Sequence, residues 1–163
     1  MNISIIKADI TEIEADAIVN VANKTLLGGG GVDGKIHRKA GPELAKECKE
    51  KFPSGINKGK AVATKAYNLK AKIIIHTVGP VYGEDDIKLL QDCYLNSLSI
   101  AEENKCKTIA FPAISTGAYG VPIEVSARYV KDILDKYSSD IIEKIILVLY
   151  DDESYNIYKY VFQ

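Results

Sequence analysis

Short runs of apolar residues, rich in Ile and Val, alternate along the chain with longer segments in which apolar residues recur every three or four positions. Continuous apolar runs of this length are typical of strands that are buried on both faces of a sheet. Five such runs predict strands at Ile3–Ile6, Ala17–Val21, Ile73–Val78, Thr108–Ile114 and Ile145–Tyr150. A sixth segment, Gly59–Ala66, alternates apolar and polar residues and predicts a more exposed strand.

The segments between these runs carry helical periodicity. Spacings of three and four residues, which mark one face of an amphipathic helix, connect Ile87, Leu90, Tyr94, Leu98 and Ala101. Proline suits the first turn of a helix, so Pro42 and Pro122 predict helices that run to about Lys51 and Tyr137. A short last helix is predicted over Asp152–Val161. Alternating strands and helices indicate an α/β fold, with a largely parallel sheet covered on both faces.

Composition narrows the class of protein. The 163 residues fit one domain spanning 1–163, and 21 basic against 22 acidic side chains leave a net charge of -1. This balance gives no general attraction for nucleic acid or anionic membranes. Three cysteines without paired spacing point to a reducing compartment rather than a zinc site or a disulfide scaffold. No apolar run is long enough for a signal peptide or a membrane span, so we expect a cytoplasmic protein without membrane contact.

Ligands of such sheets bind beyond the carboxyl ends of the strands, and two glycine-rich loops follow strands here. The first contains four consecutive glycines, residues 28–31. Because glycine loses more chain entropy on folding than any other residue, this run indicates positive φ angles or the close approach of a ligand. Successive unobstructed N–H groups ahead of a helix form an anion-binding nest. The loop also matches two nucleotide-binding patterns, but the acidic residue and the Ser or Thr that they require are missing.

The second glycine-rich loop, Ser115–Gly120, follows the predicted strand that ends at Ile114 and also precedes a predicted helix. Two anion nests at one edge of a sheet indicate a ligand with two adjacent anionic groups, such as a diphosphate. Tyr119 is flanked by small residues, a setting in which its ring can lie on a sugar or a base.

Few residues around the first loop carry candidate chemistry. Asn20 and Asn23 flank its start, while Asp33 and His37 stand four apart on one face of a helix predicted to begin near Asp33. Taken alone, Asp33 is better explained as a helix N-cap, and His37 as a solvated or hydrogen-bonded histidine. Neither a metal-ligand spacing nor a nucleophile motif appears. Catalysis would therefore use carboxylate-polarised water, without metal or cofactor.

Six segments, in order along almost the whole chain, carry a specific pattern: Asn20–Asn23, Leu26–Gly34, Ile36–Arg38, Ala40–Leu44, Ile75–Pro80 and Phe111–Pro122. This pattern closely resembles the macrodomain family. It is most similar to the MacroD-type branch, whose members remove ADP-ribose from proteins and deacetylate O-acetyl-ADP-ribose. The resemblance implies a three-layer α/β/α fold with a mixed, largely parallel central sheet.

By matching position, the resemblance also implies how the ligand is bound. Asp9, beside Ile10, is expected to receive the amino group of adenine, and Tyr150 is expected to pack near the adenine ring. The ribose and the diphosphate are expected to contact Ala22, Gly30, Gly31, Val32, Ser115, Thr116, Gly117, Ala118 and Tyr119.

For catalysis the resemblance implies that Asn23 holds the distal ribose, Asp33 positions the attacking water and His37 supports Asp33. The implied reaction is a metal-independent hydrolysis that frees mono-ADP-ribose from acidic side chains of proteins or deacetylates O-acetyl-ADP-ribose. Its partners are ADP-ribose and an ADP-ribosylated protein, and we expect a monomer. The chain departs from the family at Val21, where alanine is usual, and at Ala8, where glycine is usual, but neither change removes an expected ligand contact.

Three other functions remain alternatives. A non-catalytic module that reads ADP-ribose would use the same loops but would not need Asp33 and His37. A phosphatase acting on ADP-ribose-1″-phosphate would use the same pocket. Binding of single-stranded RNA through adenine is disfavoured, because a net charge of -1 supplies little attraction for phosphates.

Overall fold

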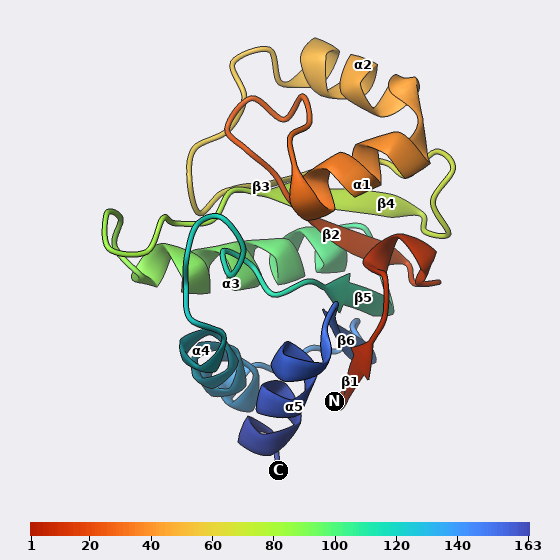
Figure 1. The fold of residues 1–163 in the computed structure, drawn as a ribbon. Coiled ribbons are helices and arrows are strands. Elements are labelled where there is room, and N and C mark those ends of the chain that lie inside the picture. The colour runs from red at the N-terminus through yellow and green to blue at the C-terminus, as the bar shows by residue number, and fades with distance from the viewer.

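Six strands and five α-helices follow one another through residues 1–163, which the computed structural model describes in full (Figure 1). The strands are β1 (Asn2–Lys7), β2 (Ala17–Val21), β3 (Ala61–Lys65), β4 (Ile73–Thr77), β5 (Thr108–Phe111) and β6 (Lys144–Leu149). The helices are a short 3-10 turn, η1 (Ile10–Glu12), and α1 (Gly31–Ala40), α2 (Pro42–Lys51), α3 (Lys88–Glu103), α4 (Ile123–Lys136) and α5 (Asp152–Val161). Every predicted strand and helix is present, with small shifts at the ends.

The strands form one sheet in the order β1-β6-β5-β2-β4-β3. All neighbouring pairs are parallel except β3 and β4, which run antiparallel. The expected mixed, largely parallel sheet of an α/β fold is therefore confirmed. One expectation is wrong: the run at Ile3–Ile6 is not buried on both faces. It lies in β1 at the edge of the sheet, where its residues are only half-buried.

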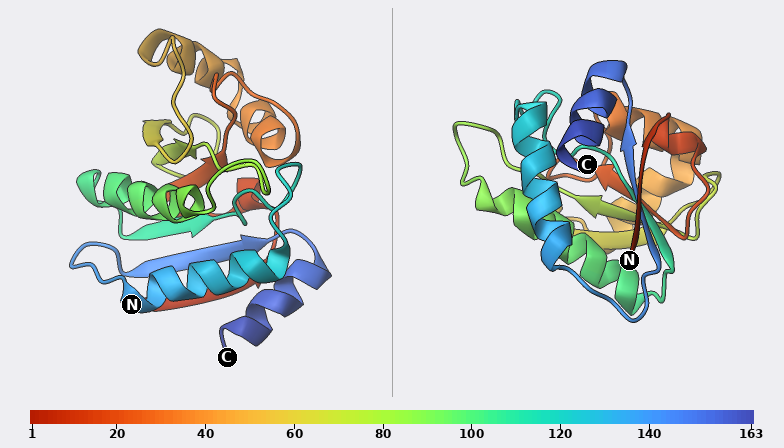
Figure 2. Two further views of the ribbon diagram at one scale, coloured as in Figure 1. Left: turned by 90° about the vertical axis from the view of Figure 1, so that its left-hand side faces the viewer. Right: turned by 90° about the horizontal axis from the view of Figure 1, so that it is seen from below.

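Helices cover both faces of this sheet. A hydrophobic cluster under α3, α4 and α5 includes Val19 of β2, whereas its chain neighbour Ile18 belongs to a second cluster under α1 and α2. Ile74 and Ile75 of β4 divide between the two clusters in the same way. Figure 2 shows α3 and α4 side by side across one face. Successive side chains of a strand point to opposite faces, so a centrally placed strand needs a continuous apolar run.

The carboxyl ends of β2, β5 and β6 meet near the middle of the view in Figure 1. β5 ends at Phe111 rather than at the predicted Ile114. Pro112 has no N–H to continue the ladder, so the chain turns away into the second glycine-rich loop. No helix in the structure combines the length and the apolar composition that crossing a membrane requires.

Candidate active site

A groove of about 460 Å³ opens at the carboxyl ends of the central strands, in the size range of small-molecule sites. Both glycine-rich loops line it. Its walls include twelve of the predicted site residues, namely Ala22, Asn23, Gly30, Gly31, Val32, Asp33, Ser115, Thr116, Gly117, Ala118, Tyr119 and Tyr150. Residues separated by more than a hundred positions in the sequence are thus brought to one surface.

A second hollow of about 350 Å³ adjoins the groove and contains the predicted Asp9 and Ile10. The two hollows share lining residues, which are Gly31, Val32, Pro112, Val148 and Tyr150. They therefore form one elongated site with a largely apolar end. A flat aromatic ring suits that end, because apolar walls exclude water from its faces while one carboxylate offers a hydrogen-bond acceptor.

Asp9 has the geometry of such an acceptor. Its Oδ1 accepts hydrogen bonds from the Thr11 backbone N–H at 2.9 Å and the Thr11 hydroxyl at 2.7 Å, so Asp9 caps η1. Hydrogen bonding from Thr11 lowers the pKa of Asp9, so the carboxylate stays ionised. Its other oxygen, Oδ2, takes part in neither bond to Thr11 and is available to a ligand amine.

Lys35 is a residue of this apolar end that the sequence analysis missed. Its Nζ lies 4.1 Å from the centroid of the Tyr150 ring, within the range of a cation–π contact. The Tyr150 side chain is itself mostly exposed. A lysine four positions after the glycine run gives no signal in the sequence, because its contact with Tyr150 depends on how α1 meets the end of β6.

The start of α1 faces the groove. The helix begins at Gly31 with Gly30 as its N-cap, and no side chain caps its first turn. The interpretation of Asp33 as an N-cap is therefore wrong, because Asp33 is the third residue of the helix. Uncapped first-turn N–H groups and the helix dipole together favour an anion at this point.

Glycines let the first loop fold back onto α1. A Cβ on Gly34 would stand only 2.5 Å from the backbone oxygen of Gly29, so no larger residue fits there without a shift. A Cβ on Gly29 would lie 3.2 Å from Asp33 Oδ2 and 3.3 Å from Asn23 Nδ2. The backbone of the loop thus packs directly against the two side chains expected to carry the chemistry.

Asp33 is the buried carboxylate of the site, with an exposed fraction of 4%. Its Oδ1 accepts a hydrogen bond from Asn20 Nδ2 at 2.9 Å and lies 3.4 Å from His37 Nε2. Burial raises the pKa of Asp33, and the Asn20 hydrogen bond and His37 partly oppose that rise. A carboxylate with a raised pKa is a stronger base than an exposed one, which suits it to accept a proton from water.

Asn23 is held rigidly at the groove. Its Oδ1 accepts hydrogen bonds from the backbone N–H groups of Thr25 and Leu26 and from the Thr25 hydroxyl. Its Nδ2 donates to the Gly28 carbonyl at 2.8 Å, which leaves one amide hydrogen available. These contacts fix the amide orientation that a ribose hydroxyl would meet.

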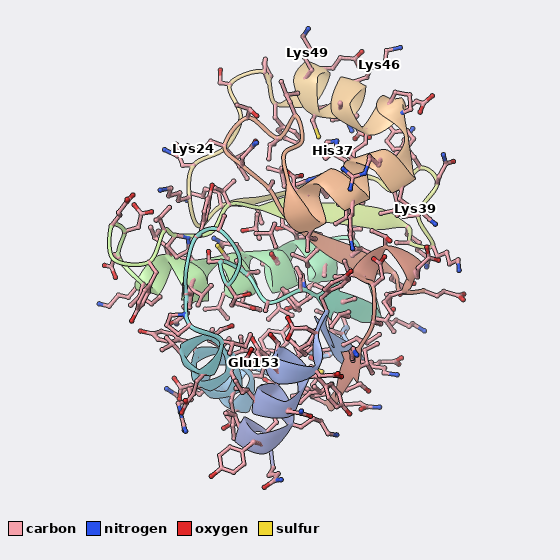
Figure 3. The ribbon with its side chains drawn as sticks, viewed as in Figure 1. Lys24, His37, Lys39, Lys46, Lys49 and Glu153 are labelled. Atoms are coloured by element: carbon pink, nitrogen blue, oxygen red, sulfur yellow. The ribbon has the colours of Figure 1, made fainter.

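His37 does not line the groove. It lies one turn along α1 from Asp33, where its ring is close to Gly28, and Figure 3 labels it beside α1. Any influence on the reaction therefore passes through Asp33. Figure 3 also labels three exposed lysines on the part of the molecule that holds α1 and α2, namely Lys24, Lys46 and Lys49, and it labels Glu153 on α5.

The second loop is held by uncharged groups. Ser115 is buried at φ +66° and sits so close to Gly79 that a Cβ there would lie 2.0 Å from Ser115 Oγ. The Thr116 hydroxyl donates to the Ala113 carbonyl at 2.9 Å, and the Tyr82 N–H donates to the Tyr119 carbonyl at 2.8 Å. Open space surrounds Gly117, so the backbone there can be approached closely by a ligand.

Two polar residues of the groove escaped the sequence analysis. Asp151 and Ser154 line it from the start of α5, where Asp151 caps the helix by accepting a hydrogen bond from the Ser154 N–H at 2.7 Å. An acidic N-cap directly after a buried strand is a signal that could have found them. His, Cys, Asp and Glu side chains form no group of three that could hold a metal ion.

Comparison with known proteins decides the family. A sequence model described as the Macro domain matches residues 19–130. The chain belongs to the Macro domain family. A macro domain-containing protein of Methanosarcina mazei is 52% identical over 161 residues, which cover 93% of this macrodomain and 83% of that protein. An O-acetyl-ADP-ribose deacetylase of Escherichia fergusonii is 47% identical over 165 residues, which cover 96% of this chain and 91% of that protein.

Solved structures agree with the fold of this macrodomain. The Oceanobacillus iheyensis macrodomain with ADP matches with a TM-score of 0.93 at 38% identity, covering 97% of this chain and 88% of that one. The Trypanosoma brucei macrodomain in complex with ADP-ribose matches with a TM-score of 0.90 at 35% identity, covering 99% of this chain and 69% of that one. The resemblance and the fold class inferred from the sequence are both confirmed.

Proposed function

We propose that this macrodomain is a hydrolase of ADP-ribose esters, which deacetylates O-acetyl-ADP-ribose or removes mono-ADP-ribose from acidic side chains of proteins. The observation that carries the proposal is Asp33, a buried carboxylate with a raised pKa on the wall of a groove that suits a dinucleotide-sized ligand. Relatives at 46–47% identity that are named O-acetyl-ADP-ribose deacetylase support the same reaction.

The groove accommodates the parts of ADP-ribose in order. Adenine occupies the apolar hollow, with its amino group directed to Asp9. The diphosphate lies between the uncapped start of α1 and the second loop, where backbone N–H groups can donate to it. The distal ribose then lies near Asn23 and Asp33, which brings the ester on that ribose to the buried carboxylate.

The chemistry needs only water and one carboxylate. Asp33 accepts a proton from a water molecule while the water oxygen attacks the carbonyl carbon of the ester. The tetrahedral intermediate then collapses, the bond between the acyl carbon and the ribose oxygen breaks, and Asp33 returns its proton to the ribose oxygen. The products are a carboxylic acid, or a free acidic side chain, and ADP-ribose.

The test is a single-turnover assay of wild type and Asp33→Ala on O-acetyl-ADP-ribose and on protein carrying carboxylate-linked mono-ADP-ribose. Losing a well-placed base should slow release by about 10²–10⁴-fold. Binding of ADP-ribose, followed by calorimetry, should fall far less, because Asp33 is only one of many groups lining the groove.

Two outcomes would contradict the proposal. Equal turnover by wild type and Asp33→Ala would remove Asp33 from the mechanism. Tight binding of ADP-ribose by wild type, with no release of product over hours, would make this macrodomain a reader of ADP-ribose rather than a hydrolase.

A further inference from the structure

A line of buried polar side chains runs from the groove across the sheet to β3. Asn20 Nδ2 donates to Asp33 Oδ1 at 2.9 Å and also lies 3.1 Å from His76 Nδ1. His76 Nε2 in turn lies 2.9 Å from the Thr64 hydroxyl. These four side chains are at most 4% exposed. They connect Asp33, on the groove wall, to Thr64, which does not line the groove. Thr64 lies on β3, two strands from β2 in the sheet.

The direction of each hydrogen bond in this line follows from Asp33. Its carboxylate only accepts, so Asn20 meets it with Nδ2, and the His76 nitrogen beside the same amide, Nδ1, must accept as well. The proton of His76 then sits on Nε2 and is donated to the Thr64 hydroxyl, which has the Lys65 carbonyl at 3.1 Å as its own acceptor. Burial lowers the pKa of His76 to about 3, so the ring is neutral and carries a single N–H. Its Nδ1 is therefore an acceptor and receives one hydrogen of the Asn20 amide, while the other goes to Asp33.

The opposite tautomer of His76 would place two hydrogen-bond donors against each other. If the proton of His76 were on Nδ1, it would meet the Asn20 amide nitrogen donor to donor. Rotating the Asn20 amide would relieve that contact but would turn its oxygen toward the carboxylate of Asp33. The Nε2–H tautomer of His76, with Thr64 as its acceptor, thus supports the Asn20 orientation in which nitrogen contacts Asp33.

This orientation of the Asn20 amide leaves a buried oxygen atom unpaired, which does not help the protein to fold. Asn20 Oδ1 is buried and has no hydrogen-bond partner. A buried polar atom without a partner destabilises a protein, because it loses its hydrogen bonds to water and gains none in return. Keeping the amide nitrogen on Asp33 and His76 therefore takes precedence over satisfying the amide oxygen, which is expected where geometry serves a site.

We propose that His76 and Thr64 are positioning residues of this active site: they fix the Asn20 amide, which holds Asp33 Oδ1 and so sets the orientation in which the carboxylate meets water. This inference rests on the proposed hydrolase function. Neither residue lines the groove, so their effect should appear in the chemical step and not in ligand affinity.

The decisive variant is Thr64→Val, which removes the hydroxyl but keeps the branched shape. Small misplacement of a catalytic group is costly, so kcat should fall about 10- to 100-fold while the Kd for ADP-ribose stays within about twofold. Thr64→Ser keeps the hydroxyl and should restore most of kcat. The matched control is Thr77→Val. Thr77 is fully buried on neighbouring β4, but its hydroxyl donates to the Lys60 carbonyl, outside this line.

A second measurement reads the imidazole directly. The chain has only two histidines, so nitrogen NMR of histidine-labelled protein resolves His37 and His76. His76 should show a protonated Nε2 and a bare Nδ1 that do not change between about pH 5 and pH 8, whereas Thr64→Val should lose the single tautomer.

Wild-type kcat in Thr64→Val, or a proton on Nδ1 of His76 in wild type, would overturn the inference. If wild type shows no turnover, the proposed function fails and the positioning role fails with it, whereas the NMR result still decides whether the hydrogen-bond line exists. A loss of kcat in Thr77→Val equal to that in Thr64→Val would reduce the effect to general destabilisation and also contradict the inference.

Discussion

The two glycine-rich loops face each other across one groove, yet their glycines differ in purpose. In the first loop, Gly29 packs against catalytic-site side chains and against Gly34 of α1, so a Cβ on Gly29 or Gly34 would meet other atoms, whereas a Cβ on Gly30 would meet nothing within 4 Å. In the second loop, Gly117 faces open space, and the glycine that permits close packing is Gly79, which lies on a different loop. The number of glycines in a loop therefore does not reveal whether they allow close packing within the protein or close approach of a ligand.

The side chains beneath the loops differ as well. Beside the first loop, Asn20 contacts both Asp33 and His76, so this set includes two titratable groups. The second is held by hydroxyl and backbone hydrogen bonds. This difference suggests a division of labour, in which the first loop carries the chemistry and the second mainly binds the diphosphate.

Gly79→Ala should lower stability more than any other substitution considered in the two loops. The new methyl group would stand 2.0 Å from Ser115 Oγ and 3.0 Å from Ile114 Cγ2, so the second loop must move. Overpacking of this kind destabilises by about 1–3 kcal/mol. Denaturant unfolding measures the loss, and calorimetry should show weaker ADP-ribose binding. An unfolding free energy equal to that of wild type would show that the second loop does not depend on this close approach.

Lowering the pH should reduce the stability of the protein through His76, the buried histidine that contacts Asn20. His76 has an ordinary pKa of 6.5, which burial lowers to about 3 in the folded protein. Below pH 6.5 the unfolded chain binds this proton and the folded protein does not, so stability is complete above pH 6.5 and is lost as the pH falls. One such group removes up to about 1.4 kcal/mol per pH unit.

The matched variant for this pH effect is His76→Gln, which stays neutral throughout. Unfolding free energies of wild type and variant, measured from about pH 6.5 to pH 5, should show a steeper acid loss in wild type. Asp33 has the opposite sign, because its raised pKa favours protonation of the folded form, but it is present in both proteins. Equal slopes would contradict the burial of a neutral His76.

The smallest stability effects are expected at Gly30 and Gly117. A Cβ on either meets no atom within 4 Å, and neither residue has a positive φ. Alanine at each position should change the unfolding free energy by less than about 0.5 kcal/mol. Both residues line the groove, so ADP-ribose affinity should nevertheless fall, as calorimetry can determine. Unchanged affinity in both variants would place the ligand elsewhere.

Local patterns predicted most of the fold because the sheet is covered on both faces. Ile18 and Val19 point into opposite clusters, and that is why β2 is a continuous apolar run. The same reasoning misjudged β1, since an apolar run does not reveal that a strand lies at an edge. It also extended β5 past Pro112, where a missing N–H ends the ladder.

The groove wall was also largely predicted, because its residues lie in two loops that directly follow strands. What the sequence did not reveal depends on contacts between distant segments. His76 lies within the predicted strand Ile73–Val78, and its contact with Asn20 exists only because β4 pairs in register with β2. The approach of Gly79 to Ser115 and of Lys35 to Tyr150 likewise arises only when separate segments of the chain meet.

The division of labour between the loops is tested most directly by measuring kcat and the Kd for ADP-ribose in Asp33→Asn and Gly117→Ala. We predict that Asp33→Asn lowers kcat by about 100-fold or more and leaves Kd within about threefold. Gly117→Ala should weaken binding and keep kcat at saturating substrate near the wild-type value. Asp33→Asn with wild-type kcat, or Gly117→Ala with lower kcat and unchanged Kd, would contradict this account.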